Sequence, residues 1–184
     1  MKKVYLAGPD VFLPEPVEMG RRKKEICAKH GLIGLFPLDN EIDLKPKGAS
    51  LNIFRSNEGL MKKAHAIIAN LTPFRGPSAD AGTVYELGYM AARRKLCIGY
   101  SNDPALYVDR VEKFTTVKPC GDRLIDAEEL TVENFRLRDN LMIIHALDLY
   151  RCQLVVPRKA PADIWHDLTA FEKCVKLAAA RLAS

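Results

Sequence analysis

Short, continuously apolar runs alternate with helix-like segments along the first hundred residues. Three of the runs end at a glycine, a proline or a Thr-Pro pair, where a buried strand would reach a turn. Because apolar and polar residues do not alternate within the runs, both faces of the strands are expected to be covered, as in a parallel sheet. The predicted strands are residues 4–7, 32–36, 66–71 and 96–100.

The segments between these runs, and several after residue 100, have helical spacing. Gly31 stands where the first helix would stop, and Ser50 is the expected N-cap of the second. The predicted helices are residues 16–30, 50–63, 82–94, 106–114, 140–150 and 162–182. This alternation predicts an α/β fold: a doubly wound, flavodoxin-like parallel sheet of four to five strands, with helices on both faces and extra C-terminal helices. The pattern places four of the strands and leaves the position of a fifth open.

Composition narrows the class of protein. A chain of 184 residues is expected to form a single domain over residues 1–184, and 48% hydrophobic with 28% charged residues argues against a disordered chain. A net charge of +5, scattered along the chain, gives little support for a nucleic-acid partner. Five widely spaced cysteines, a short N-terminal apolar run and no long apolar stretch lead us to expect a cytoplasmic protein without a membrane partner.

Polar residues gather where the predicted strands end. They are Asp10, the Asp39-Asn40-Glu41 group, Asn70 and Asp80. In an open parallel sheet, ligands bind beyond the carboxyl ends of the strands, so these side chains are expected at one edge. Neither glycine-rich nucleotide fingerprint is present, and the four histidines lack metal-ligand spacing. We therefore expect no metal and no cofactor.

Two carboxylates flank the start of the helix predicted after residue 81. Asp80 precedes this helix and Glu86 lies in its early turns, opposite an expected apolar stripe of Val84, Leu87, Gly88 and Ala91. A solvated glutamate is the ordinary interpretation of Glu86. The alternative is a pair that cleaves a glycosidic bond, with Glu86 kept anionic and the pKa of Asp80 raised by burial.

Three segments carry a specific resemblance. They are Tyr5-Leu6-Ala7-Gly8-Pro9-Asp10-Val11-Phe12, the Asp80-x5-Glu86-Leu87-Gly88-Tyr89 segment and Asn140-Leu141-Met142, joined by Pro37-Leu38-Asp39-Asn40. In this order they resemble the nucleoside 2-deoxyribosyltransferase family over most of residues 1–150.

The resemblance implies roles for three catalytic residues. Glu86 matches the nucleophile that forms a covalent 2-deoxyribosyl-enzyme, and Asp80 matches the carboxylate that handles the proton of the leaving and entering base. Tyr5 matches the tyrosine whose hydroxyl holds the nucleophile. From its position in a strand alone, Tyr5 would be read as a core aromatic residue.

The resemblance also implies substrate contacts. Phe12 resembles the aromatic residue that packs on the base, while Asn140 and Met142 match residues lent by a neighbouring subunit. Without the resemblance, Asn140 reads as a helix cap and Met142 as core. Two positions depart from some family members: Asn70 stands where an aspartate can assist the base, and Glu41 where a glutamine often contacts it.

Gly8 and Asp10, in the turn after the first strand, are also counted as substrate-binding residues. Asp10 is expected to contact a sugar hydroxyl, although an aspartate after proline also commonly caps a turn.

The expected function is transfer of a 2-deoxyribosyl group between nucleobases through a glycosyl-enzyme on Glu86, with slow hydrolysis as a side reaction. The expected partners are deoxynucleosides, free nucleobases and further copies of the chain in a homo-oligomer with shared sites, in nucleotide salvage. One alternative is an N-glycoside hydrolase of deoxynucleoside 5'-monophosphates, although Asp10 would repel a phosphate. Others are a phosphoribohydrolase, suggested by the Gly82–Glu86 string, and a non-catalytic nucleotide-sensing module.

Overall fold

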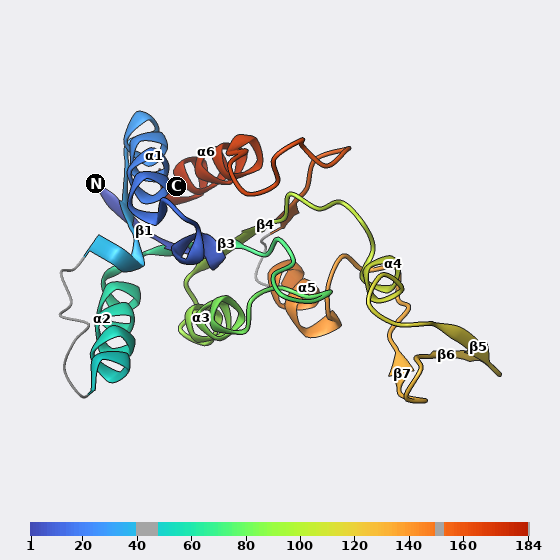
Figure 1. Ribbon diagram of the computed structural model, residues 1–184. Helices are drawn as coiled ribbons and strands as arrows, with labels where there is room; N and C mark the ends of the chain where they lie inside the picture. The colour runs from blue at the N-terminus through green and yellow to red at the C-terminus, as the bar shows by residue number, and fades with distance from the viewer. Residues whose placement is uncertain (40–47, 150–152, 184) are drawn as a thin grey trace.

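Five parallel strands form the central sheet of the computed structural model, which describes residues 1–39, 48–149 and 153–183 (Figure 1). The strand order is β2-β1-β3-β4-β8, the doubly wound order of flavodoxin-like folds. The strands are β1 (Lys2–Ala7), β2 (Leu32–Leu35), β3 (Ala66–Asn70), β4 (Leu96–Tyr100) and β8 (Leu154–Val155). The predicted fold class is confirmed, and β8 supplies the fifth strand by pairing with Gly99 and Tyr100 at the end of β4.

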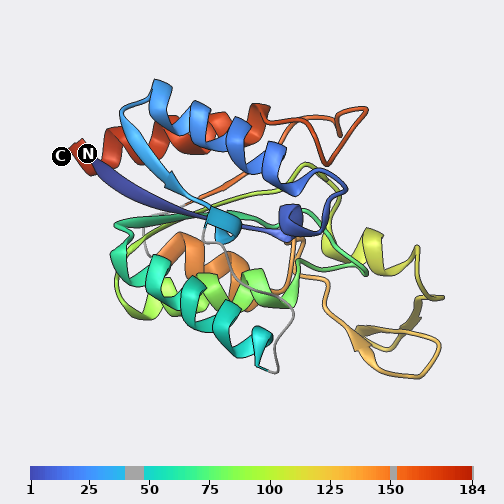
Figure 2. The same ribbon diagram turned by 60° about the vertical axis from the view of Figure 1, so that its left-hand side comes forward.

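Helices cover both faces of this sheet (Figure 2). One face carries α1 (Pro16–Lys29) and α6 (Thr169–Ala183), and the other carries α2 (Ala49–Lys63), α3 (Ala81–Ala92) and α5 (Leu141–Leu149). Adjacent strand residues divide between the two cores: Leu6 and Ile68 belong to the α1/α6 side, Tyr5 and Ile67 to the other. The continuous apolar runs are thus explained by burial on both faces.

Three sequence-based details are wrong. Gly48, in the left-handed region at φ 100°, is the N-cap of α2 rather than Ser50. The last helix begins at Thr169 rather than at residue 162, because Asp163 Oδ1 instead accepts the N–H groups of Trp165 and His166 in a turn. The buried stripe of α3 is rotated from the predicted one and consists of Thr83, Leu87, Met90 and Ala91.

A smaller antiparallel sheet, which the sequence pattern did not predict, projects to the right of the main sheet in Figure 1. Its strands are β5 (Lys118–Cys120), β6 (Arg123–Ile125) and β7 (Thr131–Val132). They pack with α4 (Tyr107–Val111) around a small core of Val108, Val111 and Val132. Two short 3-10 helices, η1 (Pro9–Phe12) and η2 (Pro37–Asp39), follow β1 and β2. In the described part of the chain, no helix is long and apolar enough to span a membrane.

Candidate active site

The centre of the site is a contact between Tyr5 and Glu86. Tyr5 is fully buried in β1, and its hydroxyl donates a hydrogen bond to Glu86 Oε1 at 2.5 Å. Glu86 lies in the second turn of α3, on the same side of the sheet as the Tyr5 ring. Strand and helix therefore hold a carboxylate and a phenol together across 81 positions of sequence.

Burial decides the protonation of this pair. Burial, opposed by the Tyr5 hydrogen bond and assisted by the nearby charge of Asp80, raises the pKa of Glu86 from its ordinary value of 4.5 to about 7. Burial and Glu86 also hold the pKa of Tyr5 well above its usual range, so Tyr5 remains a donor. The carboxyl whose pKa burial raises is thus Glu86, the group that sequence reasoning expected to remain anionic.

Asp80 caps the helix that carries Glu86. Its Oδ2 accepts hydrogen bonds from the backbone N–H and the hydroxyl of Thr83, both at 2.9 Å. No donor in the described part of the chain bonds to Oδ1, so this oxygen is available to a ligand. The two carboxylates are thus fixed relative to each other by the first turns of α3.

Both carboxylates line one cavity of about 490 Å³, a volume within the range of small-molecule sites. Its walls come from η1, η2, α2 and α3. The lining residues are Gly8, Val11, Phe12, Pro37, Leu38, Ile53, Asn57, Asp80, Gly82, Thr83 and Glu86. Gly8, Phe12, Asp80 and Glu86 of the predicted site residues therefore meet at this cavity.

Asn57 is a site residue that sequence reasoning missed. It lies on α2, lines the cavity, and has a buried Oδ1 with no hydrogen-bond partner in the described structure. An unsatisfied buried acceptor is unfavourable unless a ligand or water completes it. A lone asparagine on a helix gives no sequence signal, because its exposure to the cavity depends on the packing of α2 beside η2.

Asp10 and Asn70 are buried and do not line the cavity. Asp10 is 1% exposed, and its Oδ2 lies 2.7 Å from Lys23 Nζ. Asn70 Nδ2 donates to both Asp10 oxygens, at 3.2 and 3.3 Å. The structure thus brings the two predicted residues together but not into contact with the cavity, and Glu41 lies outside the described residues.

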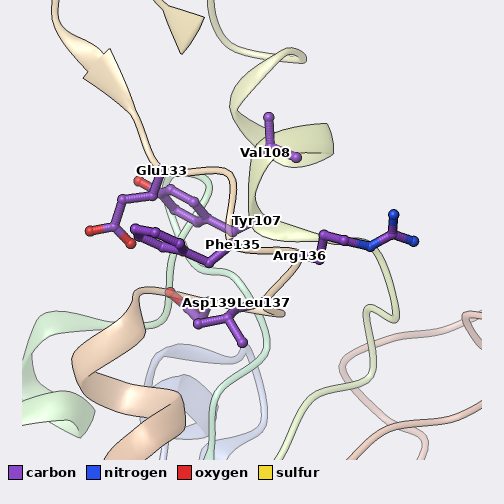
Figure 3. Close-up of a pocket in the computed structure, with 7 residues that line it drawn as sticks. All are labelled: Tyr107, Val108, Glu133, Phe135, Arg136, Leu137 and Asp139. Atoms are coloured by element: carbon purple, nitrogen blue, oxygen red, sulfur yellow. The ribbon is translucent and has the colours of Figure 1, made fainter. Parts of the chain in front are cut away.

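Asn140 and Met142 lie at the start of α5, away from the lining of this cavity. Asn140 Oδ1 accepts the N–H of Met142 at 3.0 Å, so it caps the helix, and its Nδ2 donates to Glu133 Oε1 at 3.0 Å. Met142 is 71% exposed rather than core. Figure 3 shows the side chains next to this turn, where Glu133, Tyr107 and Phe135 lie close together near the start of α5.

A buried ion pair, Arg110–Asp139, connects the start of α5 to the loop before Asp80. Asp139 accepts hydrogen bonds from the Ser78 hydroxyl, from the Ala79 N–H at 3.1 Å and from the Asn140 N–H at 2.8 Å. It also lies 3.4 Å from Arg110, whose Nε donates to the Pro77 carbonyl at 2.7 Å. The loop before Asp80 is therefore held by the residue that precedes Asn140.

Comparison with known proteins gives a family match and several similar proteins. The family model of nucleoside 2-deoxyribosyltransferases matches residues 4–142. An uncharacterised protein of Schizosaccharomyces pombe is 39% identical over 126 residues, which are 66% of this chain, and the match spans 59% of that relative's length.

Two solved structures have the same fold. A 2-deoxyribosyltransferase from Leishmania mexicana superposes with a TM-score of 0.64 at 28% identity, covering 96% of this chain and 98% of its own. A conserved protein from Enterococcus faecalis V583 gives a TM-score of 0.60 at 16% identity over 99% of both chains, which shows the fold alone. With the family model matching most of the chain, including Tyr5, Asp80 and Glu86, the protein belongs to the nucleoside 2-deoxyribosyltransferase family.

Proposed function

We propose that this protein transfers a 2-deoxyribosyl group from one nucleobase to another through a covalent intermediate on Glu86. The observation that carries the proposal is the partly buried Glu86 carboxyl, held by the Tyr5 hydroxyl at 2.5 Å and lining a cavity of about 490 Å³. A carboxylate fixed in this way is suited to attack an electrophilic carbon, because its orientation is set before the substrate arrives.

The reaction consists of two displacements at the anomeric carbon. Anionic Glu86 forms a bond to that carbon through Oε2 while Tyr5 holds Oε1, and the bond to the base breaks. Asp80 supplies a proton to the departing base nitrogen and recovers one from the incoming base. The second base then attacks the anomeric carbon on the face that the first base left, opposite Glu86, and the bond to Glu86 breaks. Two inversions at one carbon retain the configuration. Water in place of the second base releases free deoxyribose, a slow side reaction.

The cavity wall fits a flat, uncharged base. Phe12, Leu38 and Ile53 supply apolar surface, and the unpaired Oδ1 of Asn57 can accept an N–H of the base. A sugar without a 2-hydroxyl stabilises positive charge at its anomeric carbon better than ribose does, which favours deoxynucleosides. The substrates are therefore deoxynucleosides and free nucleobases.

The proposed active unit is a homo-oligomer in which Asn140 and Met142 complete a neighbour's site. Met142 is 71% exposed although it is apolar, and neither residue lines the cavity of its own subunit. Burial of such an exposed apolar side chain at an interface would be favourable.

A hydrolase of deoxynucleoside monophosphates is a weaker candidate. None of the described residues that line the cavity carries a positive charge, whereas two of them, Asp80 and Glu86, are acidic. A 5'-phosphate would therefore meet no cationic partner on this wall.

Incubation with deoxyinosine and free adenine tests the proposal, with deoxyadenosine as the expected product. A slow fluorinated deoxynucleoside should add the mass of one fluorodeoxyribosyl group to the peptide that contains Glu86. Free sugar without any exchanged nucleoside would favour a hydrolase, and a label on another peptide would refute the role of Glu86. The Glu86→Ala variant should bind nucleoside without turning it over; unchanged turnover would contradict the mechanism.

A further inference from the structure

A lysine side chain, that of Lys23, is buried in the interior of the protein near the cavity. Lys23 of α1 is 1% exposed, and its ammonium lies 2.7 Å from Oδ2 of Asp10, which is equally buried. The same ammonium lies over two aromatic rings, 5.5 Å from the centroid of Tyr100 and 5.1 Å from that of Phe171. Removing two charges from water is unfavourable, and the attraction between them roughly offsets that cost. The buried pair is therefore expected to have a role other than raising stability.

Lys23 is connected through Asp10 and Asn70 to the loops that follow β1 and β3. Asp10 belongs to η1, and Asn70 at the end of β3 donates to its carboxylate. Asn70 Oδ1 in turn accepts the N–H of Thr72 at 3.1 Å. Gly8 fits closely against this cluster, because a Cβ there would overlap Asp10 Oδ2 and lie 2.6 Å from Asn70 Cβ. The cluster therefore fixes the start of the loop after β1 and the start of the loop after β3.

Each of these two loops carries a phenylalanine. Phe12 lies two residues after Asp10, and Phe74 lies two residues after Thr72. The rings of Phe12 and Phe74 are stacked, with centroids 5.3 Å apart and planes 11° from parallel. The Phe12 ring is 56% exposed and lines the cavity with Glu86. Trp165 packs edge-on against Phe74, with centroids 6.0 Å apart.

We propose that Lys23 is a positioning residue of the substrate site: by holding Asp10 and, through Asn70, the loop after β3, it sets the place of the stacked Phe12–Phe74 pair on which a nucleobase would pack. Lys23 itself lies outside the cavity lining, and Asp10 acts through the same cluster. The nucleobase part of this inference rests on the proposed function, whereas the effect on the aromatic pair does not.

The Lys23→Met variant tests the inference, with Lys176→Met as a matched control. Lys176 is exposed on α6 and forms a surface ion pair with Glu172 at 3.1 Å. Trp165 is the chain's single tryptophan, so its fluorescence reports on the Phe74 contact without any substrate. Lys23→Met should shift the Trp165 emission of the folded protein, and Lys176→Met should leave it unchanged.

Kinetics provide the second measurement. In deoxyribosyl exchange, Lys23→Met should raise KM for the nucleoside by roughly 10- to 100-fold, since the loss of one base–aromatic stacking contact weakens binding by about that factor. The value of kcat should change much less, because Tyr5, Asp80 and Glu86 lie on other elements. A purely structural role would instead lower the folded fraction, and with it kcat, at constant KM.

A second variant decides the matter if Lys23→Met does not fold. Asp10→Asn has nearly the same shape but no charge to pair with Lys23, and it should shift Trp165 emission and KM in the same direction. Folded variants with unchanged Trp165 emission and unchanged KM would overturn the inference. If the wild-type protein has no exchange activity, the proposed function fails, and the emission shift alone still confirms or refutes the role of Lys23.

Discussion

Two carboxyl groups near the carboxyl end of β1 are held in opposite ways. Asp10 has a lysine ammonium at 2.7 Å and an amide donor from Asn70. Glu86 has a single phenol donor, and no lysine or arginine of the described chain is within ion-pair distance. The difference separates a carboxylate whose charge is paired from one whose pKa burial raises to about 7, and a pKa shifted in this way is typical of functional sites. It fits the proposed roles, in which Asp10 holds loops in place and Glu86 reacts with the sugar.

Removing the reactive carboxyl should have the largest effect. Glu86→Gln should lower kcat by about 10³-fold or more, because an amide cannot act as the nucleophile. The same change should raise the free energy of unfolding at pH 8 by about 1–3 kcal/mol, since a partly buried charge is lost. Exchange assays and urea denaturation would measure the two effects. Glu112→Gln, at an exposed position, is the control and should alter neither.

Breaking the paired carboxyl should affect stability instead. Lys23→Met should lower the free energy of unfolding by about 3–5 kcal/mol, the usual result when one partner of a buried ion pair is removed. Adding Asp10→Asn should cost less than the sum of the two single changes, because the charge left unpaired is then removed. Denaturation of the four proteins in a double-mutant cycle tests this coupling, and strict additivity would contradict it.

Removing the phenol should weaken catalysis by an intermediate amount. Tyr5→Phe deletes the hydrogen bond to Glu86, and bonds to charged groups contribute roughly 1.5–3 kcal/mol, or about 10- to 100-fold in rate. Because this bond lowers the pKa of Glu86, its loss should also move the acid limb of the kcat/KM profile to higher pH. An unshifted limb would mean that another group titrates there.

The smallest effect is that of pH on the wild-type protein. In the proposed mechanism Glu86 attacks as an anion, so kcat/KM should fall about tenfold per pH unit below its pKa of about 7 and level off above it. Stability has the opposite sign: a carboxyl whose pKa is raised by folding contributes stability below its unfolded pKa and loses it as pH rises through about 7. In Glu86→Gln this part of the pH dependence of unfolding should disappear.

The sequence predicted those parts of the fold that depend on continuous burial. Each of the first four strands contains a continuous apolar run, so their pattern is distinct from that of an exposed segment. The fifth strand, Leu154–Val155, is too short to have a period. The antiparallel sheet was missed because its strands Lys118–Cys120 and Arg123–Ile125 are mostly exposed, so they carry little apolar signal.

For the site, the resemblance located residues but not their environments. Tyr5 and Glu86 do meet, and Phe12 does line the cavity. The raised pKa of Glu86 depends on packing from α3 and β1 together, which no single segment reveals. Asn57 was missed for the same reason. The partner of Asp10 could not be predicted either, because Lys23 stands in a basic run, Arg21 to Lys24, that is typical of a solvated helix face.

The bonds of Asp139 have a consequence for an assembly with shared sites. One side chain fixes both the loop that leads to a subunit's own acid and the turn that would be lent to its neighbour. The two segments therefore depend on the same carboxylate for their positions. In the proposed oligomer, one carboxylate would therefore position residues at two reaction centres, one in its own subunit and one in the neighbouring subunit.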